Sequence, residues 1–254
     1  MKVTLLQSDI EWANPQENIR RAEHLIAAAP KSDLYILPEM WSTGFITQPE
    51  NIAESDNHSL LWMQQQANKL NASLSGSIAI TDNNTGTYRN RLYFVKPQDT
   101  AIVYYDKHHL FTYGGEDKKY TPGNQRVIVE WKGVRFLLQI CYDLRFPVWS
   151  RNNDDYDAII YVACWPTPRI EAWKTLLKAR AIENQCYVLG VNRVGKDPSC
   201  EYCGGTALID PYGKALECAE NISTFLTGNI NTQDLYTFRQ KFPVLKDQDS
   251  YKLL

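Results

Sequence analysis

The chain has 254 residues, of which 44% are hydrophobic and 22% are charged, and its formal net charge is -2. This balance is typical of a globular protein, and the length suits one large α/β domain. Basic residues form only short pairs such as Lys118-Lys119, so nucleic acid is not an expected partner. No stretch is long and apolar enough to cross a bilayer, so a membrane is not expected as a partner either.

The first segments predict a strand, a helix and a second strand. The apolar part of residues 3–7 is too short for a signal peptide and runs into polar residues, so this segment predicts a strand. Asn14 followed by Pro15 is typical of a helix start, and the helical pattern continues to about Ala28. Residues 34–37 predict the next strand, which would complete a βαβ unit.

Apolar, β-branched stretches alternate with segments of helical spacing over the rest of the chain. Helical spacing predicts helices over 59–70 and 170–182, and Thr232 could cap a last helix that runs through Phe242 and stops at Pro243. Further strands are predicted at 74–80, 92–95, 102–105, 134–140, 158–162, 187–191, 206–209 and 224–230. Short turns between residues 74 and 105 favour an antiparallel part. We expect an α/β fold with a mixed sheet, or two packed sheets, covered by helices in a single domain over residues 1–254.

The six cysteines stand at positions 141, 164, 186, 200, 203 and 218. Three of them fall in strand-like or strand-flanking text, which suits reduced thiols in the cytosol better than disulfides. Cys200-x-x-Cys203 also allows a redox or metal module. That pair lacks the second cysteine pair of a zinc ribbon, and a strand rather than a thioredoxin-like helix follows it, so we expect neither module to be the main function.

Cys141 is the first candidate for chemistry. It follows the buried-strand pattern of residues 134–140 and precedes Tyr142-Asp143-Leu144-Arg145-Phe146-Pro147, where the chain must turn. A nucleophile at such a place is presented to a pocket beside backbone N–H groups. The alternative is an inert buried cysteine, because a reactive thiol needs a suitable charged neighbour.

Three charged residues could accompany it. Glu39 follows the predicted strand at 34–37, and Lys107 follows the strand at 102–105, where an ammonium could stabilise an oxyanion. Glu116 lies in a charged segment after Gly114-Gly115. For each of them, a solvated surface side chain is the alternative.

His108-His109 suggests a metal site, but we expect none. Adjacent side chains on an extended segment point in opposite directions, and only His24 and His58 remain. No cofactor is expected.

The chain resembles the nitrilase superfamily of carbon–nitrogen hydrolases, whose Glu–Lys–Cys triad is matched in the same order by Glu39, Lys107 and Cys141. The matching text is Leu37-Pro38-Glu39-Met40, then Tyr105-Asp106-Lys107-His108-His109-Leu110-Phe111, then Cys141-Tyr142-Asp143-Leu144-Arg145-Phe146-Pro147. The resemblance covers nearly the whole chain and continues through residues 163–169, 179–185 and 205–213. Within the superfamily the chain looks most like the bacterial omega-amidases, on residues 141–152, 184–193 and 239–243.

The resemblance implies a four-layer α-β-β-α sandwich, a cytoplasmic homodimer and hydrolysis of the terminal amide of 2-oxoglutaramate or 2-oxosuccinamate. It makes Cys141 the nucleophile, Glu39 the general base and Lys107 an oxyanion donor. Glu116 matches a second pocket glutamate. The segment 196–203 departs from the expected pattern, since it carries a cysteine pair.

A 2-oxo acid amide also carries a carboxylate, so its pocket needs a cation or N–H donors. Arg145, Arg169 and Arg193 are candidates, although each could equally be a structural ion-pair partner. Tyr142, Phe146 and Trp165 could form an aromatic wall, whereas Trp41 and Trp173 could equally be core. Other activities of the superfamily, on simple amides, nitriles or N-carbamoyl amino acids, stay open, as does a non-catalytic binding protein with this fold.

Overall fold

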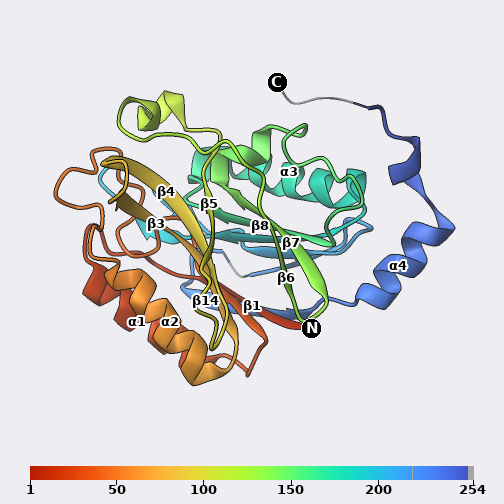
Figure 1. The fold of residues 1–254 in the computed structure, drawn as a ribbon, viewed down its shortest axis with the longest axis horizontal. Coiled ribbons are helices and arrows are strands. Elements are labelled where there is room, and N and C mark those ends of the chain that lie inside the picture. The colour runs from red at the N-terminus through yellow and green to blue at the C-terminus, as the bar shows by residue number, and fades with distance from the viewer. Residues whose placement is uncertain (219, 251–254) are drawn as a thin grey trace.

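Two six-stranded sheets face each other and carry helices on their outer faces (Figure 1). The structure is a computed structural model and describes residues 1–218 and 220–250. The first sheet has the order β14 (Thr224–Asn229), β1 (Lys2–Gln7), β2 (Leu34–Ile36), β3 (Ser73–Asp82), β4 (Thr87–Val95), β5 (Val103–Asp106). The second has the order β13 (Ala215–Glu217), β12 (Ala207–Ile209), β9 (Tyr187–Asn192), β8 (Ala158–Ala163), β7 (Val134–Ile140), β6 (Ile128–Trp131).

The helices complete the outer layers of an α-β-β-α sandwich, as predicted. Helices α1 (Pro15–Ala28) and α2 (His58–Leu70) pack on the first sheet, and α3 (Ile170–Glu183) packs on the second. Helix α4 (Thr232–Lys241) follows β14, and β10 (Val194–Lys196) and β11 (Glu201–Cys203) form a separate two-stranded sheet. Short 3₁₀ helices are η1 (Thr112–Gly114), η2 (Glu116–Lys118), η3 (Cys141–Arg145), η4 (Thr167–Arg169) and η5 (Val244–Asp247).

The main core lies between the two sheets. Alternate residues of β7 show why: Phe136, Leu138 and Ile140 join the cluster between the sheets, whereas Leu137 packs on the α3 side. Because successive side chains of a strand point to opposite faces, a strand covered on both sides is expected to be apolar at most positions. Trp41 and Trp173 are almost fully buried and belong to the two outer clusters.

The predicted strands and helices are all present; β4 begins five residues earlier than predicted, and the other ends shift by at most two. The βαβ unit is confirmed, because β1 and β2 pair in parallel around α1. Asn14 caps α1 by accepting the Glu17 N–H at 3.2 Å. Strands β3, β4 and β5 pair antiparallel, as predicted. The described residues contain no helix with the length and apolarity that a membrane span requires.

Two details differ from the predictions. The cap of α4 is Asn231, not Thr232, because the Asn231 side chain accepts the Gln233 and Asp234 N–H groups. Strands β6, β10, β11 and β13 were missed. They are only three or four residues long, and their pairing depends on the partner strand more than on local propensity.

Candidate active site

Strand ends from both sheets meet at one buried place. Glu39 follows β2 and Lys107 follows β5 in the first sheet, while Cys141 follows β7 in the second. The side chains of Glu39 and Lys107 are 0% exposed. Neither is the solvated surface charge that the sequence left possible.

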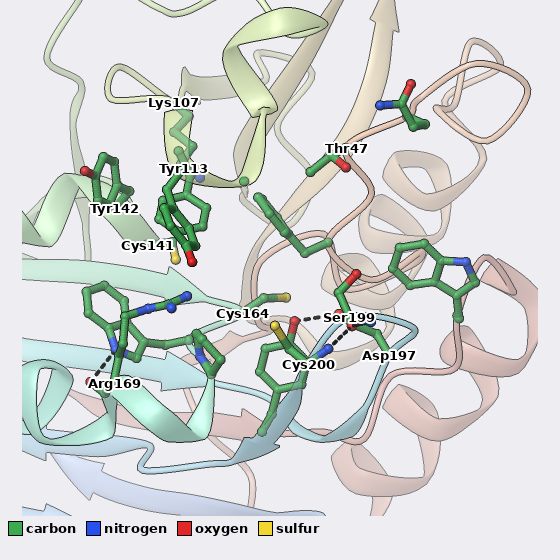
Figure 2. Close-up of a pocket in the computed structure, with 18 of the residues that line it drawn as sticks. Thr47, Lys107, Tyr113, Cys141, Tyr142, Cys164, Arg169, Asp197, Ser199 and Cys200 are labelled. Carbon is green, nitrogen blue, oxygen red and sulfur yellow. Dashed lines mark hydrogen bonds between the residues drawn. The ribbon is translucent and has the colours of Figure 1, made fainter.

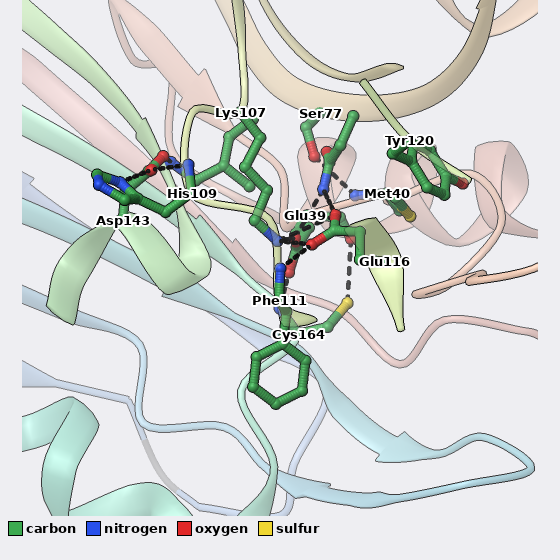
Figure 3. A network of polar contacts seen from close by, with 12 residues as sticks. Glu39, Met40, Ser77, Lys107, His109, Phe111, Glu116, Tyr120, Asp143 and Cys164 are labelled. Carbon is green, nitrogen blue, oxygen red and sulfur yellow. Dashed lines mark hydrogen bonds and ion pairs between the residues drawn. The ribbon is translucent and has the colours of Figure 1, made fainter. Parts of the chain in front are cut away.

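Lys107 is held between two carboxylates (Figure 3). Its Nζ donates to Glu39 Oε1 at 2.9 Å and to both oxygens of Glu116, at 3.1 and 2.8 Å. Asn90 Nδ2 donates to Glu39 Oε1 at 2.8 Å and to Glu116 Oε1 at 3.1 Å. The Phe111 N–H donates to Glu116 Oε2 at 2.7 Å. These bonds compensate the charges of a buried ion network and leave it little freedom.

The second oxygen of Glu39 faces the other sheet. The Cys164 N–H, just beyond β8, donates to Glu39 Oε2 at 2.8 Å, and Cys164 Sγ donates to the Glu39 carbonyl at 3.2 Å. Both carboxylate oxygens of Glu39 are therefore fixed, one by each sheet.

Cys141 has an unusual backbone. Its φ is +45°, and it begins the 3₁₀ helix η3 directly after β7. A non-glycine residue in this left-handed region costs about 1 kcal/mol or more, and such strain gathers at functional sites. After this turn Cys141 packs against the core on one side and lines a cavity on the other.

The electrostatics favour a neutral thiol and a charged lysine at rest. Burial raises the pKa of Cys141 well above its usual value, the Glu39 charge raises it further, and Lys107 only partly opposes this. Burial alone would lower the pKa of Lys107, but the charges of Glu116 and Glu39 outweigh it, so the pKa is raised. Burial raises the pKa of Glu116 against the effect of Lys107.

The raised pKa of Cys141 leads to a testable expectation for the protein without substrate. A raised pKa means that the Cys141 thiolate is scarce at pH 7, so alkylation of Cys141 by N-ethylmaleimide should be slow there and rise about tenfold per pH unit through pH 9. Peptide mass spectrometry would follow Cys141 separately from the other thiols. In urea-unfolded protein the rate should instead level off near pH ~8.5. A plateau below pH 7 in the folded enzyme would contradict this protonation state.

A cavity of about 510 Å³ opens in front of Cys141 and Lys107 (Figure 2). Its lining includes Tyr142, Arg145, Trp165 and Arg169, four of the residues predicted to contact substrate. The Arg145 guanidinium lies over the Trp165 ring at 5.0 Å, and that of Arg169 lies over Phe111 at 5.4 Å. Within residues 1–218 and 220–250, neither guanidinium has a carboxylate within ion-pair distance. Two guanidiniums without an ion-pair partner therefore face a pocket whose other lining combines aromatic side chains with polar ones, the acidic Asp197 among them.

Two other candidates lie elsewhere. Phe146 is not among the described residues that line the cavity, because its ring stacks on His109 with centroids 3.8 Å apart. Arg193 is fully buried and donates to the carbonyls of Ile10, Val194 and Lys196. Phe146 instead supports the cavity wall from behind, since its ring meets that of Tyr142 edge-on at 5.1 Å.

The orientation of His108 and His109 differs from the prediction. The rings of His108 and His109 do not point apart, because they meet edge-on with centroids 4.5 Å apart. The segment after β5 is not extended, so the alternation rule of strands does not apply to it. In the described part of the chain, no cluster of three or more His, Cys, Asp or Glu side chains could hold a metal ion.

Asn90 and Cys164 were missed as site residues. Asn90 lies in the middle of β4, where asparagine is uncommon. Its presence in a strand was the only feature of the sequence that could have marked it as a site residue. Cys164 acts through its backbone N–H, which no side-chain pattern reveals. Cys200 also lines the cavity, although its partner in the Cys200-x-x-Cys203 pair does not.

Comparisons with known proteins agree with this geometry. A family model described as carbon–nitrogen hydrolase matches residues 2–240. The chain is 40% identical to omega-amidase YafV of Escherichia coli, over 100% of this chain and 98% of the relative. It is 34% identical to a 2-oxoglutaramate amidase of Bacillus subtilis, over 96% of each. A CN-hydrolase superfamily protein from Xanthomonas campestris, solved with an arsenic adduct in its active site, superposes with a TM-score of 0.95 at 40% identity, covering 100% of this chain and 98% of that one.

Proposed function

Because the chain belongs to the carbon–nitrogen hydrolase family, we propose that it releases ammonia from the terminal amide of a small 2-oxo acid, such as 2-oxoglutaramate or 2-oxosuccinamate. The observation that carries this proposal is the cavity itself, where a thiol, a buried ammonium and two unpaired guanidiniums face one another. Full-length similarity to omega-amidase and 2-oxoglutaramate amidase supports the substrate class.

The reaction begins with proton transfer from Cys141 to Glu39. The carboxylate is held ready on both oxygens, while the thiol is neutral at rest. Substrate binding brings the amide carbonyl to the thiol, and the sulfur attacks the carbonyl carbon as Glu39 takes the proton. General-base assistance of this kind is typically worth about 10²–10⁴-fold in rate.

Lys107 stabilises the tetrahedral oxyanion together with a backbone N–H, for which Tyr142 is the candidate. The ammonium stays charged because two carboxylates flank it. Glu116 would keep Lys107 in place rather than react, since its oxygens are occupied by Lys107, Asn90 and the Phe111 N–H.

Collapse of the intermediate breaks the C–N bond. Glu39 returns its proton to the departing nitrogen, which leaves as ammonia and leaves a thioester on Cys141. Glu39 then takes a proton from water, the hydroxide attacks the thioester carbonyl, and the second collapse frees the acid and restores the thiol. Every proton passes through one carboxylate, and no cofactor is needed.

Arg145 and Arg169 would bind the substrate carboxylate. Replacing either with glutamine should raise KM for 2-oxoglutaramate about tenfold or more, because a hydrogen bond to a charged group contributes about 1.5–3 kcal/mol. A neutral amide of similar length, such as butyramide, is the internal control, and its kcat/KM should change less than threefold. Steady-state ammonia release measures both. Equal losses on the charged and the neutral substrate would exclude that arginine from carboxylate binding.

A single substrate screen tests the proposed function. Ammonia release would be measured from 2-oxoglutaramate, 2-oxosuccinamate, glutamine, simple amides, nitriles and N-carbamoyl amino acids. The highest kcat/KM should fall on a 2-oxo acid amide. A preference for a nitrile or a carbamoyl compound would keep the chemistry and change the substrate, and no turnover of any of them would favour a binding protein.

We also propose that residues 1–254 act as one domain in a cytoplasmic homodimer. The shared core between the two sheets supports the single domain. Apolar side chains that are about half exposed, such as Val148 and Ile182, support an interface beside α3.

A further inference from the structure

Asp143, two residues after Cys141, has a hydrogen-bonding environment that the reaction above does not use. Its side chain is 0% exposed. Oδ2 accepts the Ile140 N–H at 2.9 Å and the Tyr105 hydroxyl at 2.8 Å. Oδ1 accepts the His109 N–H at 3.0 Å and His109 Nδ1, which therefore carries a proton, at 2.8 Å. A carboxylate has about four acceptor positions, so all of them are used.

These four bonds join the two segments on which the reaction depends. Figure 3 shows the contacts between Asp143 and His109. Ile140 immediately precedes Cys141, so one bond fixes the strand end that enters the strained turn. Tyr105 and His109 stand two residues before and two residues after Lys107. One carboxylate thus holds the strand end at Cys141 and both flanks of Lys107, although the two come from different sheets.

The Tyr105 hydroxyl is itself oriented. It accepts Trp149 Nε1 at 3.0 Å and the His108 N–H at 3.2 Å, which leaves its own proton for Asp143. His108 stacks on Trp149 with ring centroids 3.7 Å apart. Burial and then the Asp143 charge raise the pKa of Tyr105, so the hydroxyl stays protonated as a donor.

We propose that Asp143 is a positioning residue that sets the placement of the Cys141 thiol relative to the Lys107 ammonium. The inference rests on the proposed roles of Cys141 and Lys107. It adds that their relative position is set by a buried carboxylate whose hydrogen bonds are separate from those of Glu39 and Glu116. Nucleophile and oxyanion donor must be placed together to within about an ångström, because a displacement of that size can cost ~10²-fold in rate.

Asp143→Asn tests this placement with a side chain of nearly the same shape. An amide has one oxygen and one NH₂ group, so in either orientation its NH₂ faces a backbone N–H, that of Ile140 or that of His109. Either the segment at Cys141 or the segment at Lys107 must shift. We expect kcat to fall about 30–100-fold, while KM changes less than threefold because Arg169, on η4, lies outside both segments.

Asp157→Asn is the matched control. Asp157 is also fully buried, also accepts a backbone N–H, from Arg135 at 3.0 Å, and also accepts a tyrosine hydroxyl, from Tyr236 at 3.3 Å. It precedes β8 and so lies at the opposite end of the parallel strands β7 and β8 from Cys141. Both variants should lower Tm, but Asp157→Asn should keep kcat within threefold.

The decisive readout is the rate of thioester formation in a single turnover, followed by rapid quenching and mass spectrometry. It should fall in Asp143→Asn and stay unchanged in Asp157→Asn. If Asp143→Asn does not fold, Tyr105→Phe decides instead, because it removes one donor to Oδ2 and should slow thioester formation at least fivefold. Unchanged thioester formation in the folded Asp143 variant, or equal losses in both aspartate variants, would overturn the inference. A Cys141→Ala arm that still turned over substrate would overturn the proposed function instead.

Discussion

Cys141→Ala is expected to lower amide hydrolysis at least ~10⁴-fold, because removal of a catalytic nucleophile typically costs that much or more. The loss should fall on kcat, since the arginines and aromatic side chains of the cavity remain. The free energy of unfolding should stay the same or rise slightly. The variant removes only a half-buried thiol whose ionisation burial disfavours, and alanine keeps the same backbone strain. Ammonia release and urea unfolding at pH 7 would measure the two effects.

Cys186→Ala is the control, in which stability should fall and activity should not. Cys186 is fully buried against the α3 side of the second sheet, and its Sγ contacts the Arg180 carbonyl at 3.7 Å. Its removal leaves a small cavity, so stability should fall by about 1 kcal/mol while kcat is unchanged. If Cys141→Ala retained more than a hundredth of the wild-type kcat, Cys141 could not be the attacking group.

Much of the fold could be predicted because its strands are covered on both faces. Residues 158–163 read as a continuous apolar segment, and residues 134–140 are interrupted only by Arg135 and Gln139, so both can be recognised as buried strands without knowledge of their partners. The short strands at 194–196 and 201–203 could not be predicted. Their pairing depends on the turn between them, where Asp197 accepts the N–H groups of Ser199 and Cys200.

The site also contains residues that could be predicted from the sequence and residues that could not. Glu39, Lys107 and Cys141 could be nominated because each follows a predicted strand. Glu116 could not be told from a solvated charge, because its partners Lys107, Asn90 and the Phe111 N–H are brought to it only by the folded chain and not by a sequence pattern. Phe146 was misplaced for a related reason. Its neighbour Arg145 lines the cavity, but the tight turn of η3 directs the Phe146 ring to His109 instead.

Lys107→Met is expected to lower kcat at least ~10²-fold, through two effects of one change. The oxyanion loses its charged donor. In addition, Glu39 and Glu116 are left as two fully buried carboxylates that share the Asn90 amide and have no cation. Since like charges this close cannot both stay ionised at low cost, one carboxyl will hold a proton near pH 7, and the general base will be partly lost.

The same change should make stability depend on pH in a stated direction. In the variant, a folded-state carboxyl pKa lies above its unfolded value of about 4.3, so above that pH the folded state binds more protons than the unfolded state. The free energy of unfolding should therefore fall as pH rises from 4.5 to 8, with a deficit relative to wild type that grows towards about 3–5 kcal/mol, the usual cost of breaking a buried pair. Urea unfolding at several pH values would measure it.

Lys119→Met separates this effect from the general loss of a lysine. Lys119 lies three residues after Glu116 and contacts Glu50 at the surface, with its side chain 38% exposed. Solvent screens such a pair, so neither kcat nor the pH profile of stability should change measurably. A Lys107→Met enzyme with kcat within tenfold of wild type would remove Lys107 from the reaction. A flat stability profile would mean that Glu39 and Glu116 both stay ionised without it, so the loss of activity would then have to come from the oxyanion alone.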